Sequence, residues 1–468
     1  MKKVFFRLSV LLSAVIVFAS CLGNDDDDLV YYGDMSIQSF TLGKLNCYET
    51  ITASDGTEST TKTTITGSDY KFFIDQINHE IYNPDSLPYG TDASHVVCTI
   101  TSKNSSNIGI KSLISDTIFV YTSTDSIDFS SPRHVMVFAN DGSGYRDYTV
   151  RVNVHQEKEG EFRWTAKNVN EAFQPMTGMK AQVCGERLFV AGTDGTTGAT
   201  YSTDLNDGNN WTAATPDFTL PVGFYQNLIS DGQYLYALNE GNLIRSSNGD
   251  SWETVAAAGV QQLIGFAADK FYGLSADGVL MSSADGADWT VSAIDDNQAL
   301  MPMQNLSICA HPLKTDATVS RVLLTGNRSA TDYPDDKYSV SWVKIADPSM
   351  SDDANPWMFC TAEAANLLLP RLNHLTAVAY GEGVLALGAE GIGYGWKPFT
   401  QFYYTDDGGL NWQSDSRFLL PGTFSSNSAF AMTVDADNYL WIIASGSGQV
   451  WRGRLNDLGW DVIQREFK

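Results

Sequence analysis

Short runs in which apolar and polar residues alternate dominate the first third of the chain. Between residues 29 and 157, where Thr, Ser, Val and Ile are frequent, such runs span residues 36–40, 95–100, 134–138 and 148–154. A period of two is typical of strands with one buried face. Asn140-Asp141-Gly142 marks a turn between the last two runs. Many short strands over this length predict a β-sandwich at residues 29–157.

A repeated unit follows the charged linker at residues 156–161. In each copy an apolar strand leads through a polar turn into a second apolar strand. The copies span residues 181–192, 227–238, 262–274, 306–326, 375–388 and 430–444. Repeats of this size predict a β-propeller with four-stranded blades. We therefore predict an all-β chain whose sandwich is followed by a six-bladed β-propeller at residues 160–468, with seven blades as the alternative. Residues 162–165 are predicted to add an outer strand to the last blade and so latch the ring.

Four of these copies continue into a second pattern, in which a polar strand end is followed by Asp or Asn, then Gly, then Trp. It occurs at residues 202–211, 246–252, 282–289 and 404–412. The pattern resembles the Asp-box of the BNR or sialidase-like β-propellers. A tight hairpin explains it, because Gly takes the positive φ, Asp or Asn bonds the turn backbone, and Trp packs between blades. The box is structural, so it predicts the fold and not a catalytic activity.

The N-terminus has the layout of a secretory signal. Lys2, Lys3 and Arg7 precede an apolar run at residues 8–19, which is too short to span a membrane. Phe18-Ala19-Ser20-Cys21 resembles a bacterial lipoprotein box. The resemblance implies that residues 1–20 are a lipoprotein signal peptide and that the Cys21 sulfur is lipidated, with outer-membrane lipid as the partner. A plain secretory signal with an incidental Cys21 is the alternative.

An acidic run, Asp25 to Asp28, follows this cysteine and makes residues 21–28 an acidic tether. It resembles the surface-export signal of Bacteroidetes lipoproteins, whereas charge runs in general are solvated spacers. The closing strands of the predicted sandwich resemble the Ig-like or cadherin-like modules of such proteins. The whole layout resembles Bacteroidetes surface lipoproteins of unknown function. This implies a lipid-anchored protein of the outer membrane, exposed at the cell surface, with the sandwich as a stalk.

The net charge of the chain argues against one class of partner. The chain of 468 residues has 30 Lys plus Arg against 55 Asp plus Glu, a formal net charge of -25. A chain this acidic repels phosphate backbones, so no nucleic-acid partner is expected.

Five cysteines follow Cys21, and an odd number cannot all pair. Export permits disulfides, of which Cys47–Cys98 and Cys309–Cys360 are possible. Cys184 and Cys309 lie in apolar runs and are expected to be buried free thiols.

No motif in the sequence predicts catalysis, a metal or a cofactor. A sialidase needs three converging arginines, and Arg371 alone lies just before an inner strand. The six histidines show no spacing typical of a zinc site. Residues 435–438 fit a plain turn better than a calcium loop. Paired carboxylates of another glycosidase remain an open alternative, although nothing identifies a particular pair.

Amide residues precede the inner strands of five blades, where they are expected to surround one mouth of the central channel. With neighbouring aromatic and basic residues they form the candidate ligand site, namely Tyr225, Gln226, Gln261, Gln304, Asn305, Arg371, Asn373, His374, Trp396 and Asn427. Amides suit sugar hydroxyls, which take paired donors and acceptors beside an aromatic platform. The alternative is that these amides tie adjacent blades together through the backbone.

The leading functional hypothesis is a non-catalytic surface lipoprotein that binds a glycan or protein ligand through the propeller face. A carbohydrate-active enzyme, either a glycoside hydrolase or a lyase, is the first alternative. A structural adhesin or surface-complex component is the second. A carboxylate pair at the channel mouth would favour the enzyme, and an aromatic and amide pocket without such a pair would favour binding.

Overall fold

The structure is a computed structural model with two compact units, one of residues 1–158 and 461–468 and one of residues 159–460. It describes residues 32–52, 58–351, 354–361, 364, 367–389, 401–425, 428–461 and 463. Regular structure in these residues consists of β-strands and short 3-10 helices. Among them no helix is long and apolar enough to cross a membrane.

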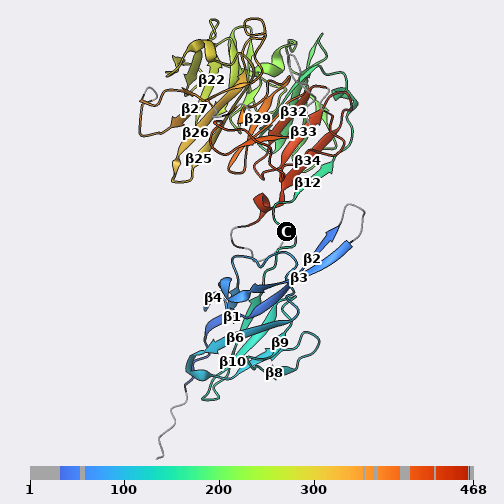
Figure 1. Ribbon diagram of the computed structural model, residues 1–468, viewed down its shortest axis with the longest axis vertical. Coiled ribbons are helices and arrows are strands. Elements are labelled where there is room, and N and C mark those ends of the chain that lie inside the picture. Colours follow the sequence, from blue (N-terminus) through green and yellow to red (C-terminus); the bar gives the residue numbers. More distant parts are fainter. Residues whose placement is uncertain are drawn as a thin grey trace, which may run out of the picture. The chain divides into compact units, whose positions relative to one another are not determined.

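The N-terminal unit is built from strands, as its alternating runs predict. A six-stranded sheet has the order β4-β5-β11-β10-β7-β8, a three-stranded sheet the order β1-β6-β9, and β2 pairs with β3 (Figure 1). The bounds are β1 Ile37–Leu42, β2 Lys44–Thr52, β3 Glu58–Thr66, β4 Phe73–Asp75, β5 Glu80–Tyr82, β6 Val96–Ser102, β7 Ile108–Lys111, β8 Ile118–Val120, β9 Ser126–Ile127, β10 Arg133–Phe138 and β11 Tyr145–Arg151. In β6 every second residue from Val96 to Ile100 is buried. These side chains share one core with Val135, Tyr148 and Val150.

The second unit is a six-bladed β-propeller within the described residues. Blades one to four are the four-stranded sheets β13–β16, β17–β20, β21–β24 and β25–β28, and blade five is β29–β31. Blade six is β32–β34 together with β12. The inner strands contact one another in the order β13, β17, β21, β25, β29, β32 and back to β13, which closes the ring. The predicted six blades are thus confirmed, and the seventh is not needed.

The strands of blades one to three are β13 Gly178–Cys184, β14 Arg187–Thr193, β15 Gly198–Asp204, β16 Thr212–Ala213, β17 Ile229–Ser230, β18 Leu235–Asn239, β19 Asn242–Ser246, β20 Glu253–Ala257, β21 Gln262–Ala267, β22 Lys270–Leu274, β23 Leu280–Ser283 and β24 Thr290–Val291. Those of blades four to six are β25 Gln304–Leu313, β26 Asp316–Asn327, β27 Val340–Ala346, β28 Met358–Phe359, β29 Thr376–Tyr380, β30 Gly383–Leu387, β31 Tyr403–Thr405, β32 Phe430–Val434, β33 Leu440–Ala444, β34 Val450–Leu455 and β12 Phe162–Ala166.

The predicted latch is confirmed. β12 pairs antiparallel with β34, from Phe162 opposite Leu455 to Ala166 opposite Trp451. Figure 1 shows the two strands side by side in blade six. The ring is therefore closed by a strand from the start of the propeller added to its last blade. Backbone groups at the edge of β34 are paired in this way.

The Asp-boxes form the expected hairpins. In blade three the Gly286 φ is 77° and Asp285 Oδ1 accepts from the backbone N–H groups of Ala287 and Asp288, both at 2.9 Å. Trp289 Nε1 donates to Gly286 O at 2.9 Å. A Cβ on this glycine would collide with Leu243 of blade two. The box hairpin therefore needs glycine for two reasons, its backbone conformation and its contact with the preceding blade.

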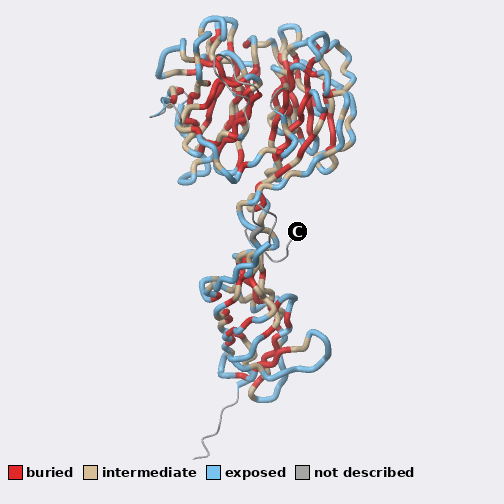
Figure 2. Tube along the Cα trace, turned by 45° about the vertical axis from the view of Figure 1, so that its right-hand side comes forward, coloured by how far each residue is buried: buried red, intermediate tan, exposed pale blue. Residues whose placement is uncertain are grey.

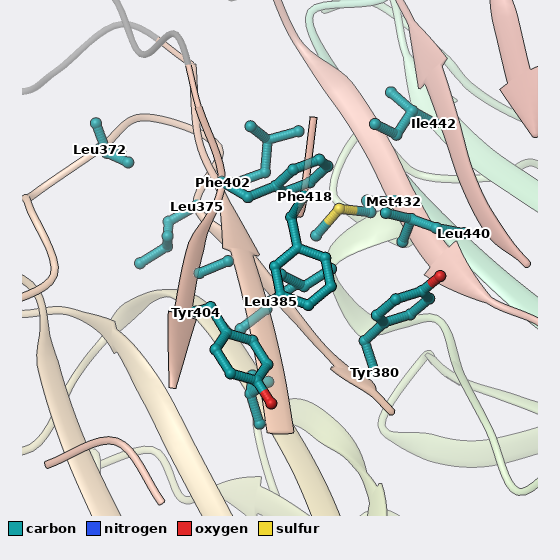
Figure 3. Close-up of a cluster of buried hydrophobic side chains, with 14 of the residues drawn as sticks. Leu372, Leu375, Tyr380, Leu385, Phe402, Tyr404, Phe418, Met432, Leu440 and Ile442 are labelled. Atoms are coloured by element: carbon teal, nitrogen blue, oxygen red, sulfur yellow. The ribbon is translucent and has the colours of Figure 1, made fainter. Parts of the chain in front are cut away.

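Buried apolar side chains fill the spaces between blades. Figure 2 shows buried residues following the propeller strands while the connecting loops are exposed. The largest cluster lies between blades five and six, where Tyr380, Phe418 and Met432 face one another (Figure 3). Tyr380 Oη also accepts from the backbone N–H of Leu455 at 2.8 Å. This hydrogen bond joins blade five to β34, the strand of blade six that pairs with β12.

All five described cysteines are free and buried. Cys184 and Cys309 are thus the buried thiols that the sequence indicates. Neither Cys47–Cys98 nor Cys309–Cys360 is a disulfide in this structure. Burial raises the pKa of the Cys98, Cys309 and Cys360 thiols to about 12.

Candidate functional site

The inner strands of all six blades surround a central channel of about 290 Å³. Most of its lining is apolar or small, as in Ile264, Ile308 and Met432. The polar side chains of Ser307, Thr376 and Lys180 lie where the channel opens into a second cavity.

This second cavity, here called the mouth pocket, has a volume of about 440 Å³. It is lined by the short 3-10 helix η4 (Phe224–Asn227) and by the first residues of inner strands, as predicted for the amides. Its lining residues are Met179, Lys180, Tyr225, Gln226, Gln262, Leu263, Met303, Gln304, Asn305, Leu306, Ser307, His374, Leu375 and Thr376. The volume is in the range of about 300–1,000 Å³ that is typical of small-molecule sites.

The structure brings half of the predicted site residues together in the mouth pocket: Tyr225, Gln226, Gln304, Asn305 and His374. They come from blades two, four and five or from the segments just before them.

Three predicted residues lie elsewhere. Gln261 and Asn373 are exposed and do not line the mouth pocket, although the residue after each of them does. Arg371 is 0% exposed, and its guanidinium donates to the backbone oxygens of Tyr333 at 2.8 Å and Arg328 at 3.3 Å. Arg371 therefore holds a loop of blade four in place and is not available to a ligand in the mouth. Arg371 is among the predicted site residues because it lies just before an inner strand.

The remaining two predicted residues, Trp396 and Asn427, lie outside the described residues, as does the lipidation residue Cys21.

Hydrogen bonds divide the amides around the mouth into two groups. Asn227 Oδ1 accepts from the Leu263 N–H at 2.9 Å, which ties the start of blade two to blade three. Asn305 Oδ1 accepts from Asn327 Nδ2 at 3.1 Å, and so it is partly engaged within blade four. Asn227 and Asn305 therefore agree with the alternative interpretation, in which the amides hold the fold together. Gln304, by contrast, is exposed and its side chain has no hydrogen-bond partner among the described residues.

Backbone geometry places two further groups at the mouth. Asn305 has a φ of 53° and His374 a φ of 51°, both in the left-handed region. Each residue stands just before or at the start of an inner strand, where the chain must turn into the blade. Burial lowers the pKa of His374 and so favours its neutral imidazole.

Tyr225 packs where a glycine leaves room for it. A Cβ on Gly178, at the start of β13, would collide with the Tyr225 ring. The Tyr225 hydroxyl also lies 3.3 Å from Gln226 Nε2. An aromatic face and an amide are therefore held next to each other at the edge of the pocket.

Sequence reasoning missed Lys180, which links the mouth pocket to the channel. It is half-buried on β13, and its Nζ donates to Gln226 O and Ile264 O, each at 3.4 Å. Burial alone lowers the pKa of Lys180 to about 8. The available signal was a lysine directly before the predicted inner strand that begins at Ala181.

The described residues that line the mouth pocket include no Asp and no Glu. No group of three or more His, Cys, Asp or Glu within the described ranges is placed to hold a metal ion. The chemistry available at the mouth is therefore hydrogen bonding by amides and hydroxyls, an aromatic face, and one ammonium group.

Family models match most of the chain. The DUF6242 beta propeller domain matches residues 158–463, and the N-terminal domain of DUF6242, a domain of unknown function, matches residues 40–152. The chain belongs to the DUF6242 family. This match confirms the predicted β-propeller. No match is found among curated proteins.

Several solved structures resemble this DUF6242 chain at low identity. A structural genomics protein of unknown function from Bacteroides thetaiotaomicron is 10% identical, with a TM-score of 0.41, and the alignment covers 82% of this chain and 98% of that chain. The fucose-specific lectin from Aleuria aurantia is 12% identical, with a TM-score of 0.34 and coverages of 60% and 92%. Trypanosoma rangeli sialidase is 10% identical, with a TM-score of 0.32 and coverages of 69% and 56%. These values assign neither a ligand nor an activity to this chain.

Proposed function

We propose that this DUF6242 chain is a lipid-anchored surface protein of the outer membrane that binds a glycan, without catalysis, in the mouth pocket of its propeller. The anchor and the location rest on the signal, Cys21 and the acidic tether in the sequence. Binding in the mouth rests on one observation, the gathering of amide, hydroxyl and aromatic side chains from several blades around a cavity of about 440 Å³.

The lining is suited to sugar hydroxyls. Gln304 offers two N–H donors and a carbonyl acceptor, so this amide bonds a hydroxyl in both directions. Gln226 Nε2 donates to the Tyr225 hydroxyl, which leaves Gln226 one N–H donor and its carbonyl acceptor for a ligand.

Ser307 Oγ accepts from the Ala377 N–H and so keeps its own proton for a ligand. Thr376 Oγ1 donates to His374 O and so keeps an acceptor. Tyr225 adds an aromatic face.

A hydrolytic alternative is less well supported. A glycosidase commonly needs two carboxylates that flank the scissile bond. No carboxylate lines the mouth pocket within the described residues.

The surface-complex alternative would use the exposed edge strand β8, with Phe119 at 57% and Val120 at 76% exposure. The mouth pocket gathers polar and aromatic side chains from several blades, so glycan binding is the function we propose.

A glycan array tests the proposal, with the purified protein freed of the predicted signal peptide. Mass spectrometry of the bound sugars reports any turnover. We expect binding without turnover, and Gln226→Ala and Gln304→Ala should each weaken it, because each removes hydrogen bonds to the ligand.

Gln233→Ala is the matched control, because this exposed glutamine follows β17 and lies at the other end of the inner strand. Equal binding by all three variants would place the ligand elsewhere. Conversion of a bound sugar would overturn the non-catalytic assignment.

A further inference from the structure

The ammonium group of Lys180 stands at the boundary of the mouth pocket and the central channel, and it lines both. Its two hydrogen bonds reach the backbone oxygens of Gln226, before blade two, and Ile264, in blade three. Both measure 3.4 Å, longer than the roughly 2.7–3.2 Å of a typical N–H···O bond. An ammonium group has three donors, so these two long bonds leave it incompletely satisfied.

No carboxylate is paired with Lys180 among the described residues, although the chain has 55 Asp plus Glu. The titratable side chains that line the two cavities beside it are Tyr225, His374 and Cys309. Burial favours the neutral form of His374 and of the Cys309 thiol. Among the described residues Lys180 is therefore a positive charge without a counter-ion, held in a half-buried position.

A half-buried charge without a partner costs stability, and a bound counter-ion would offset that cost. A ligand that brings one negative group would complete the hydrogen bonds and neutralise the charge in a single contact. Charge-assisted bonds of this kind are about twice as strong as neutral ones. The amides at the rim, Gln226 and Gln304, would meanwhile bind neutral hydroxyls of the same ligand.

We propose that the mouth pocket selects a glycan end that has one anionic substituent, a carboxylate or a sulfate, and that Lys180 Nζ binds this group. This inference rests on the proposed function, and it names the class of glycan. One ammonium group matches one monoanion. A polyanion would place further charges against a lining that holds no second cation among the described residues.

Isothermal titration with matched oligosaccharides tests the proposal: a neutral one, its uronate counterpart and its sulfated counterpart. The purified protein should bind at least one acidic sugar tenfold or more tighter than the neutral one. Tighter binding of the uronate identifies a carboxylate, and tighter binding of the sulfated sugar identifies a sulfate. Equal affinities for all three would overturn the inference while leaving glycan binding intact. Absence of binding to every array glycan would overturn the proposed function, and this inference with it.

Lys180→Met removes the charge and keeps a flexible chain of similar length. It should abolish the preference for the acidic sugar and keep the binding of the neutral one. Lys337→Met is the matched control, because Lys337 is exposed in a propeller loop and outside the mouth pocket. Retention of the acidic preference by Lys180→Met would overturn the inference.

A measurement on the unaltered protein keeps the test decisive if Lys180→Met does not fold. Affinity for the acidic sugar should fall at least threefold between pH 7 and pH 9, as Lys180 loses its proton, while affinity for the neutral sugar stays constant. A carboxylate or sulfate ester keeps its charge over this interval. A pH-independent preference for the acidic sugar would contradict the role of Lys180.

Discussion

The side-chain oxygen of Asn227 accepts a hydrogen bond of 2.9 Å from the backbone N–H of Leu263, and it thereby joins blade two to blade three. The residue just before it, Gln226, lines the mouth pocket, and within the described residues its side chain hydrogen-bonds only to the Tyr225 hydroxyl. Two adjacent amides therefore have different tasks. One replaces a missing backbone partner between blades, and the other remains available to a ligand.

Asn227→Ala should lower the free energy of unfolding by about 1–3 kcal/mol, because the N–H of the fully buried Leu263 loses its acceptor. Gln226→Ala should change it by less than about 0.5 kcal/mol, as is usual for an exposed side chain. Urea unfolding followed by tryptophan fluorescence compares the two variants. A large loss of stability in Gln226→Ala would show that this amide also supports the fold.

Tyr380 and Tyr404 give a matched pair inside one core (Figure 3). Tyr380 Oη accepts from the Leu455 N–H at 2.8 Å, whereas the Tyr404 hydroxyl has no hydrogen-bond partner among the described residues. Tyr380→Phe should lower the free energy of unfolding by about 1–3 kcal/mol, since it leaves a buried N–H unsatisfied. Tyr404→Phe removes the same atom without that loss. Similar melting temperatures for the two variants would show that the bond to blade six contributes little.

A glycine pair separates backbone strain from crowding. Gly286 has a φ of 77° and a Cβ there would collide with Leu243, whereas Gly232 has a φ of 91° and open space around it. Gly232→Ala should cost about 1–2 kcal/mol for the left-handed backbone alone. Gly286→Ala should cost about 1–3 kcal/mol more than Gly232→Ala, because its methyl group also overpacks against blade two. Equal losses of stability in thermal unfolding would mean that the blades separate enough to admit the methyl group.

The repeating parts of the fold were predictable because their signals recur. Six strand pairs with similar turns identify the blades, and the box around Asp285 and Gly286 follows from local turn chemistry that needs no tertiary information. The latch at Phe162 was predictable for a related reason, since an outer strand without a neighbour in sequence must find an edge.

The site was predictable only in part, because side-chain direction depends on how blades pack. Position before an inner strand indicated Gln304 and His374, which line the mouth pocket, but also Arg371, whose guanidinium instead donates to loop carbonyls. Lys180 was missed since its importance arises from the absence of a nearby carboxylate among the described residues. That absence is a property of the closed ring and has no counterpart in local sequence.

Lys180 should reduce the stability of the propeller in the absence of ligand. Burial lowers its pKa from 10.5 to about 8, which means that the folded state disfavours the charged form. Between pH 8 and 10.5 the unfolded chain binds more protons at this residue than the folded chain, so this contribution makes stability rise with pH. Below pH 8 the cost is fully present, and Lys180→Met should raise the free energy of unfolding at pH 7 by about 1–3 kcal/mol.

Urea unfolding of the unaltered protein and of Lys180→Met at pH 7 and pH 10 measures this contribution. The advantage of the variant should be largest at pH 7 and should shrink at pH 10, because the lysine is then mostly neutral in the folded state. Other groups titrate in this interval, such as Lys167, whose pKa is also lowered by burial. Both proteins contain these groups, so their contributions cancel in the difference between the two free energies of unfolding. A variant less stable than the parent at pH 7 would mean that the bonds to Gln226 O and Ile264 O outweigh the cost of burying the charge. If Lys180→Met is more stable but no longer prefers the acidic sugar, the lysine contributes to ligand binding and not to the stability of the fold.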